Sequence, residues 1–257
     1  MGELIGLEGE SLPDGLARTL ILTLTADYAE GREEAALLAL RLRANEVSLQ
    51  PGLISAEVHN ICESVTSRRQ PFLIFKWESD EAHLRYFWSP ESFKYLDILE
   101  DKFANESIRI ERWSYLHNPL MLREEAAPKL HSMILEDTMN PTECLPANVE
   151  EFPDTTERTL EAFAVTITAR CNMSFYQDFC EKMQILEVSA QIEEGCLAFE
   201  VYTRIEENAQ FLIYSVYRTE DDYQYHSEQS YSFFLCGIMK MVTMMRMDRW
   251  KRLDPYL

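Results

Sequence analysis

The chain has 257 residues, with 24 lysines and arginines against 44 aspartates and glutamates, so its formal net charge is −20. So acidic a chain repels nucleic-acid phosphates and anionic lipid surfaces, which argues against nucleic acids and membranes as partners. The charge excludes no fold and does not exclude an enzyme. The 46% hydrophobic and 26% charged composition is typical of a folded globular protein. No apolar run approaches the roughly 18 residues of a membrane span. The six cysteines form no CxxC pair, as is usual for reduced thiols in a cytoplasmic protein.

The first half of the chain predicts the order β-α-β-β-α-β. Threonine alternates with leucine or isoleucine in the first strand, which indicates one buried face. The first helix stops at Pro51-Gly52, and the second is expected to break near Ser89-Pro90, because proline lacks an amide donor. The elements are a strand over 19–26, a helix over 31–50, a hairpin of strands over 53–61 and 71–77, a helix over 80–102 and a strand over 108–115.

The second half repeats this order. Arg18-Thr19-Leu20 aligns with Arg158-Thr159-Leu160 at an offset of 158 − 18 = 140 residues, and the same offset pairs Trp77 with Tyr217. The segment 52–59 matches 195–202, with three more residues in the second copy. The repeated elements are a strand over 160–169, a helix over 174–192, strands over 196–205 and 210–217, a helix over 220–241 and a strand over 244–253.

We therefore predict two domains joined by a connector. The divisions are an N-terminal tail over 1–16, a first domain over 17–116, a connector with a short helix over 117–157, and a second domain over 158–257. An antiparallel sheet with both helices on one face leaves its other face bare. The two copies are therefore expected to pack sheet to sheet and to enclose an apolar cavity.

Three segments of the first copy carry a family resemblance: 51–59 (PGLISAEVH), 75–82 (FKWESDEA) and 86–93 (YFWSPESF). Pro-Gly opens the second strand, an aromatic residue ends the third, and a Ser-Pro turn lies in the second helix. This order resembles the antibiotic biosynthesis monooxygenase domain of the dimeric α+β barrel superfamily. The second copy resembles it more weakly, at Glu194-Gly195, Tyr217 and His226.

The resemblance implies an α+β fold of two ferredoxin-like domains with antiparallel sheets. The family normally pairs two chains, whereas here the copies are expected to pair within one chain, with a further homodimer left open. Members include cofactor-free oxygenases of aromatic polyketide pathways, heme-degrading enzymes, quinol oxygenases, isomerases and proteins of unknown role. The heme-degrading branch is disfavoured, because Tyr95-Leu96-Asp97 occupies the place of its ligating histidine.

Two histidines are the candidate catalytic residues. His226 stands at the family's histidine position and can act as a general base, since imidazole titrates near neutral pH; the alternative is a helix-surface histidine beside the acidic run 220–222. His59 lies two residues after Glu57, so strand alternation puts both on one face. There they can form a proton relay, or His59 can be a core histidine or part of a solvated strand edge.

Aromatic side chains are the candidate substrate-binding residues, because their faces stack on flat ligands, with core packing as the alternative for each. Those singled out are Trp77, Tyr86, Trp88, Tyr202, Tyr214 and Tyr217. The histidines show no HxH or HExxH spacing and the cysteines no zinc pairing, so no metal is expected. No GxGxxG or P-loop pattern signals a nucleotide cofactor, so no cofactor is expected.

These features favour an enzyme of secondary metabolism, without a cofactor, acting on an apolar polycyclic or polyketide-like intermediate. In the oxygenase version, a base deprotonates a phenolic substrate and the resulting anion reacts directly with O₂. In a second version, the same barrel cavity serves a non-redox isomerase or cyclase, pericyclic reactions included. A third interpretation is a ligand-binding or stress-response module without turnover.

Overall fold

A computed structural model describes residues 19–64, 70–92, 101–104, 106–116, 162–207, 209–228, 238 and 240–253, with side chains given up to residue 61 in the first range. The tail predicted over 1–16 and the connector predicted over 117–157 lie outside these residues.

The chain forms two runs of the same elements, here named copy one and copy two. Copy one contains β1 (Leu20–Thr25), α1 (Glu33–Ser48), β2 (Leu53–Ser64), β3 (Pro71–Trp77), α2 (Asp80–Phe87) and β4 (Arg109–Tyr115). Copy two contains β5 (Phe163–Cys171), the short 3₁₀ helix η3 (Met173–Phe175), α5 (Tyr176–Gln191), β6 (Cys196–Arg204), β7 (Gln210–Tyr217), α6 (Glu220–Glu228) and β8 (Val242–Leu253). The predicted α+β class and tandem duplication are confirmed. The helix α2 ends just before Ser89-Pro90, where the sequence predicts a break.

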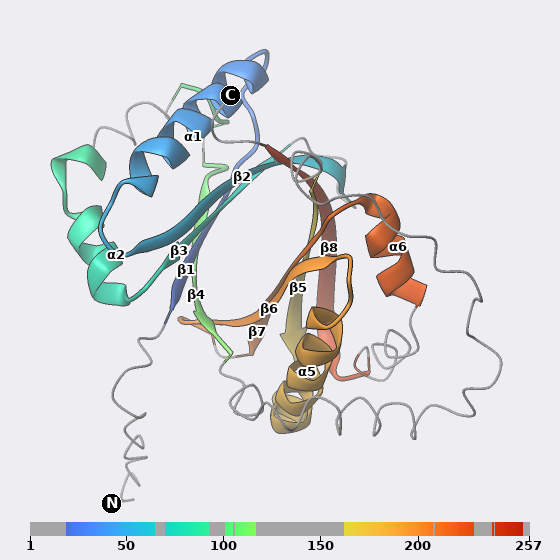
Figure 1. Cartoon of the computed structure of the whole chain (residues 1–257). Coiled ribbons are helices and arrows are strands. Elements are labelled where there is room, and N and C mark those ends of the chain that lie inside the picture. The colour runs from blue at the N-terminus through green and yellow to red at the C-terminus, as the bar shows by residue number, and fades with distance from the viewer. Residues whose placement is uncertain are drawn as a thin grey trace, which may run out of the picture.

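All eight strands close into one antiparallel barrel in the order β1-β3-β2-β8-β5-β7-β6-β4. Each copy supplies four adjacent strands, and the copies meet at two seams, β2 with β8 and β4 with β6. Figure 1 shows α1 and α2 outside the strands of copy one, and α5 and α6 outside those of copy two. The predicted intrachain dimeric α+β barrel is therefore confirmed.

The strand register corrects the alignment of the two copies. Leu20 pairs with Trp77 in copy one, and Phe163 pairs with Tyr217 in copy two. The offset is thus 163 − 20 = 143 residues at the first strand but 217 − 77 = 140 at the third. The alignment of residue 18 with residue 158 was wrong by three residues. The reason lies in the second strand, which has 12 residues in β2 and 9 in β6.

A glycine lets the second helix of each copy approach the sheet closely. Gly52 has φ +83°, a left-handed conformation that favours glycine, and a Cβ atom there would lie 2.6 Å from the Cβ of Ala82 on α2. Gly195 occupies the same place in copy two, where a Cβ atom would clash with Asp222 on α6. The Pro-Gly turn and its counterpart therefore set the distance between sheet and helix.

A cluster of buried side chains packs together inside the barrel. An eight-stranded barrel is just wide enough for side chains to fill it. The buried residues inside the barrel include Ile21, Phe72, Ile74, Trp113, Ala164, Tyr202, Leu212, Tyr214, Val216 and Trp250. The indole N–H of Trp113 donates to Thr23 (2.9 Å) and that of Trp250 donates to Thr166 (2.8 Å), one pair in each copy.

Separate cores lie between the strands and the helices outside the barrel. In copy one Leu24, Leu40 and Leu73 pack together between α1 and the sheet. In copy two Phe179 and Phe211 belong to the equivalent cluster beneath α5. Among the helices in the described parts of the chain, none combines the length and apolar character needed to cross a membrane.

Candidate functional site

A cavity of about 500 Å³ lies in copy one, between the outer face of its sheet and the helices α1 and α2. Its apolar wall includes Leu22, Leu24, Val47, Phe75, Ile108 and Ile110. Its aromatic and polar members include Arg43, Trp77, His83, Tyr86, Ser92 and Arg112. The sequence predicts a cavity between the two sheets, whereas the cavity described here lies on the helix side of the copy-one sheet.

Trp77 and Tyr86 both line this cavity, at positions where the sequence predicts substrate-binding residues. Their rings stack with centroids 5.4 Å apart, and the Arg43 guanidinium lies 5.0 Å from the centre of the Tyr86 ring. Within the described residues, the Trp77 indole nitrogen and the Tyr86 hydroxyl have no hydrogen-bond partner. A mostly apolar wall with a few polar atoms of this kind is typical of small-molecule sites.

His83 is a cavity residue that the sequence analysis did not single out. It lies on α2, is only 7% exposed, and packs edge-on against Trp77 with ring centroids 5.8 Å apart. Its Nδ1 atom has no hydrogen-bond partner in the part of the chain described. Burial lowers the pKa of this imidazole and Arg112 lowers it further, while Asp80 opposes the shift. The ring is therefore neutral near pH 7.

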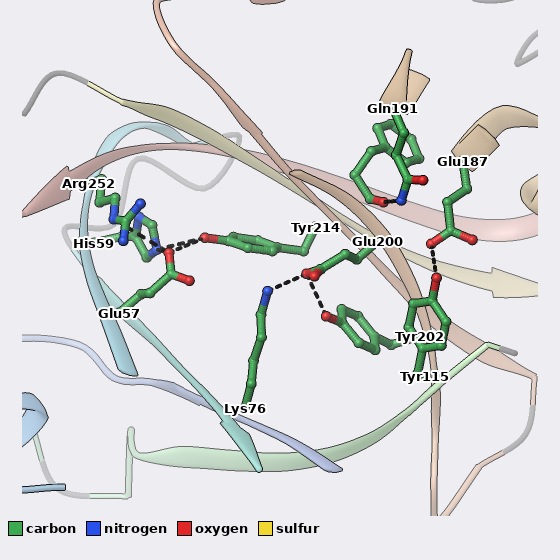
Figure 2. Close-up of polar contacts among 11 residues, drawn as sticks. Glu57, His59, Lys76, Tyr115, Glu187, Gln191, Glu200, Tyr202, Tyr214 and Arg252 are labelled. Atoms are coloured by element: carbon green, nitrogen blue, oxygen red, sulfur yellow. Dashed lines mark hydrogen bonds and ion pairs between the residues drawn. The ribbon is translucent and has the colours of Figure 1, made fainter. Parts of the chain in front are cut away.

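His59, one of the two histidines that the sequence suggests as catalytic, lies inside the barrel, where Figure 2 shows it beside Glu57, Tyr214 and Arg252. Tyr214 on β7 donates to Glu57 on β2 at 2.9 Å and lies 3.1 Å from His59 Nε2. Since the phenol has one proton and the carboxylate only accepts, Nε2–H of His59 donates to the Tyr214 oxygen. The predicted placement of Glu57 and His59 on one strand face agrees with this geometry.

Burial dominates the ionisation of this group. It lowers the pKa of His59 to about 4, against the partial opposition of Glu57. Burial raises the pKa of Glu57, but His59, Arg252 and Lys76 together hold it below its ordinary value. Burial and Glu57 raise the pKa of Tyr214 well above its ordinary value. The stable state is thus a neutral imidazole, a neutral phenol and a carboxylate paired with cations.

A second polar contact crosses the barrel from Lys76 on β3 to Glu200 on β6, at 2.5 Å. Tyr202 donates to the same carboxylate oxygen of Glu200 at 2.6 Å, as Figure 2 shows. Burial and Glu200 raise the pKa of Tyr202 well above its ordinary value. Two of the four tyrosines predicted to bind substrate, Tyr202 and Tyr214, therefore use their hydroxyls within the barrel interior.

His226 is buried on α6 in copy two. Its Nδ1 atom lies 2.8 Å from Glu193, and its ring packs 5.2 Å from Tyr217 and 5.8 Å from Phe199. The alternative of an exposed helix-surface histidine was therefore wrong. Tyr217 also packs 5.4 Å from Tyr223, so these aromatic rings contact one another in the space that corresponds to the cavity of copy one.

The remaining predicted residue, Trp88, is 68% exposed at the end of α2 and packs against Phe87. The structure thus brings Trp77 and Tyr86 together at one cavity, places His59, Tyr202 and Tyr214 inside the barrel, and places His226 with Tyr217 in copy two. The sequence signal that could have found His83 is its spacing, three and four residues before Tyr86 and Phe87 on one helix face.

Among the described side chains, no group of three or more histidines, cysteines, aspartates or glutamates is arranged to hold a metal ion. The cysteines whose side chains are described, Cys171, Cys180 and Cys196, are free thiols. The polar groups at the cavity include three guanidinium groups (Arg43, Arg112 and Arg204), the carboxylate of Glu206 and the neutral imidazole of His83. Such a set can bind and deprotonate a weakly acidic organic ligand.

Fold and site together define a single-chain dimeric α+β barrel with a cavity between sheet and helices. Residues 173–232 match the sequence profile of the family Antibiotic biosynthesis monooxygenase. The resemblance seen in the sequence is therefore confirmed, with the profile match in copy two. No curated protein matches the chain.

Solved structures with the same fold span almost the whole chain. A candidate monooxygenase of Fusobacterium nucleatum has a TM-score of 0.71 at 10% identity, covering 93% of this chain and 94% of its own. A candidate monooxygenase of Lactobacillus acidophilus has a TM-score of 0.63 at 9% identity, covering 91% and 94%. An anthrone oxidase-like protein has a TM-score of 0.58 at 11% identity, covering 92% of both chains. At these identities the likeness concerns the fold.

Proposed function

We propose that this protein is a cofactor-independent monooxygenase that binds a flat, apolar, phenolic polycyclic compound in the cavity of copy one. The observation that carries the proposal is the cavity itself, about 500 Å³ in volume and walled by apolar side chains with Trp77 and Tyr86 among them. This volume falls in the usual range of small-molecule sites. The family profile and the monooxygenase names of proteins with this fold support the same reaction class.

The reaction needs no metal or organic cofactor if the substrate itself gives electrons to O₂. In the enol tautomer of an anthrone, one hydrogen of the CH₂ carbon has moved to the carbonyl oxygen and forms a phenolic hydroxyl. When this hydroxyl loses its proton, the electron-rich anion can reduce O₂ and form a carbon–oxygen bond at the former CH₂ carbon. Loss of water from the resulting hydroperoxide leaves a carbonyl. The balance is one CH₂ group and one O₂ giving one C=O group and one water. The protein contributes deprotonation, orientation and exclusion of bulk water.

The cavity wall suits such an anion. Arg43 and Arg112 supply positive charge in a chain whose net charge is −20. Arg112 also donates to Asp80 at 2.7 Å, which holds its guanidinium at the cavity wall. Charge placed in advance beside a buried site stabilises developing negative charge more strongly than water does. An isomerase or cyclase and a non-catalytic binding protein would use the same cavity, so the test must separate them.

The test uses dithranol, a hydroxylated anthrone, with the purified full-length chain in air-saturated buffer. Oxygen uptake and anthraquinone absorbance are recorded together, and the spontaneous oxidation of dithranol in buffer is subtracted. We expect one O₂ consumed for each quinone formed, at a rate proportional to protein concentration. Conversion without O₂ uptake would favour the isomerase or cyclase, and saturable binding without conversion would favour the binding module.

A pair of matched variants tests whether the ligand binds in the cavity of copy one. Leu84 on α2 lines the cavity and is 40% exposed, so Leu84→Trp should reduce the cavity volume without disturbing the core. Leu38 on α1 is 54% exposed and does not line the cavity, so Leu38→Trp is the control. We expect binding of alizarin, a coloured dihydroxyanthraquinone, to weaken about tenfold or more in the first variant alone. Equal binding by both variants would place the site elsewhere.

A further inference from the structure

We propose that His83 is the general base of the copy-one cavity and takes the phenolic proton of the bound substrate. This inference rests on the proposed function and adds to it the residue that generates the reactive anion. His83 differs from the two histidines that the sequence suggests, since it lines the described cavity whereas His59 and His226 do not.

The position of His83 follows from the local sequence. Ser79 caps α2 by accepting the amide of Ala82, and the His83 amide donates to the Ser79 carbonyl, so the first turn of the helix is fixed. The imidazole then packs between the rings of Trp77 and Phe87, each with its centroid 5.8 Å away. The orientation of the ring is therefore set by packing, as a proton acceptor requires.

The hydrogen-bonding state of His83 suits a base. A buried polar nitrogen normally has a partner, and leaving one without a partner costs free energy. The Nδ1 atom of His83 has none among the described residues, and the Tyr86 hydroxyl beside the same cavity has none either. Neighbouring atoms cover this nitrogen while the cavity is empty, and a bound phenolic ligand that donates to it would supply the missing partner.

Two charged groups act directly on His83, while Arg43 on α1 lines the same cavity. Arg112 on β4 faces it, and Asp80 on its own helix is bonded to that arginine at 2.7 Å. Arg204 and Glu206 line the same cavity farther along the sheet. Burial and Arg112 favour the neutral imidazole while the cavity is empty. A bound phenolate would reverse this balance, because its negative charge stabilises an imidazolium beside it.

The step transfers a single proton. The O–H bond of the ligand breaks, the N–H bond of the imidazolium forms, and the electron pair stays on the ligand oxygen. Nothing is oxidised or reduced until the anion meets O₂. The imidazolium then returns its proton to the peroxide anion and gives the hydroperoxide. Loss of water from the hydroperoxide breaks its O–O bond and the remaining C–H bond and leaves the carbonyl.

In copy two, the position that corresponds to His83 holds a residue that packs in the core and is not a base. The residue that corresponds to His83 is Tyr223, 223 − 83 = 140 positions later, and its ring packs 5.6 Å from Phe163 and 5.4 Å from Tyr217. Tyr223 also donates to Met247 at 3.6 Å. The hydroxyl of Tyr223 thus has a hydrogen-bond partner, whereas the Nδ1 atom of His83 has none among the described residues.

The test measures the ionisation of bound alizarin, whose colour changes when its phenol loses a proton. In the wild-type chain we expect bound alizarin to ionise at a pH lower than free alizarin. In His83→Gln we expect binding to persist and ionisation to move up by about one pH unit or more. With dithranol, kcat should fall about 100-fold or more and KM should change little. Arg85→Gln, an exposed change on the same helix away from the cavity, is the control.

The outcomes separate this inference from the proposed function. Alizarin that binds and ionises equally in wild type and His83→Gln, with an unchanged pH profile of kcat, would overturn the role of His83 and leave the cavity proposal standing. A wild-type chain that does not bind alizarin would overturn both. If His83→Gln does not fold, His83→Phe keeps the ring packing against Trp77, lacks both nitrogens, and faces the same two outcomes.

Discussion

Tyr214 of copy two donates a 2.9 Å hydrogen bond to Glu57 of copy one, inside a barrel in which neither group meets bulk water freely. The same phenol oxygen lies 3.1 Å from His59, so one side chain satisfies two buried groups of the other copy. This contact joins the copies more specifically than apolar packing can, because a buried carboxylate without its donor is costly.

We expect Tyr214→Phe to lower the free energy of unfolding by about 1–3 kcal/mol, since Glu57 and His59 both lose a partner while the ring packing is kept. Urea denaturation measures the change. Tyr225→Phe, at a residue 57% exposed on α6, should alter stability by no more than about 0.5 kcal/mol. Equal effects of the two changes would mean that the barrel contact adds nothing.

Stability should fall as the pH is lowered. His59 has a pKa of about 4 in the folded chain against 6.5 as its ordinary value, so the unfolded chain binds more protons between these two pH values. The stabilisation is fully present above pH 6.5 and is lost progressively toward pH 4, by about 3 kcal/mol in all. Below that range Glu57, whose pKa is also lowered, continues the loss in the same direction.

The measurement is the urea midpoint of the wild-type chain and of His59→Gln across this range. The variant is expected to be less stable near neutral pH and to show a shallower dependence on pH. Parallel curves for the two chains would assign the pH dependence to other groups.

Gly52→Ala should cost about 2 kcal/mol or more, because the new Cβ atom would lie 2.6 Å from Ala82 and the φ of +83° disfavours any side chain. Gly31→Ala is the matched comparison, since Gly31 has φ +69° with open space around it. There we expect the conformational cost of about 1–2 kcal/mol without the clash. Thermal unfolding compares the two, and equal costs would show that α2 moves aside freely.

His226→Ala distinguishes the two copies. Because Glu193 would lose its 2.8 Å partner and the rings of Tyr217 and Phe199 would face a hole, we expect a loss of about 1–3 kcal/mol of stability. Alizarin binding in copy one should persist. If His226 were the general base that the sequence suggests, turnover would fall without a loss of stability. A fully stable His226→Ala chain that has lost turnover would support that prediction and place the chemistry in copy two.

Strands with clear boundaries could be predicted from the sequence. β3 (Pro71–Trp77) and β7 (Gln210–Tyr217) begin and end at the predicted residues, since each is an apolar run bounded by polar or turn residues. Strand alternation alone also predicted that the side chains of Glu57 and His59 lie on the same face of their strand.

Which face of the strand looks into the barrel could not be predicted in the same way. Lys76 lies inside and Trp77 lies under the helices, although both belong to an apolar strand with no polar side to mark the outside. A shift of one residue exchanges the two faces. The cavity exists because α1 and α2 leave a gap above the sheet. The size of that gap depends on how the two helices pack on the sheet, which no local sequence pattern predicts. His83 was missed for this reason: its spacing before Tyr86 and Phe87 marks one face of a helix, but it does not show that this face lines a cavity.

The seams between β2 and β8 and between β4 and β6 join unlike partners within one chain. In a barrel of two identical chains every substitution is made twice, so a lysine placed inside would face its own copy across the axis. Here Lys76 corresponds to Val216, since 216 − 76 = 140, and the single lysine of the pair meets Glu200 of the other copy. Fusion therefore lets each half change separately, so that one can specialise in chemistry while the other is free to specialise in support.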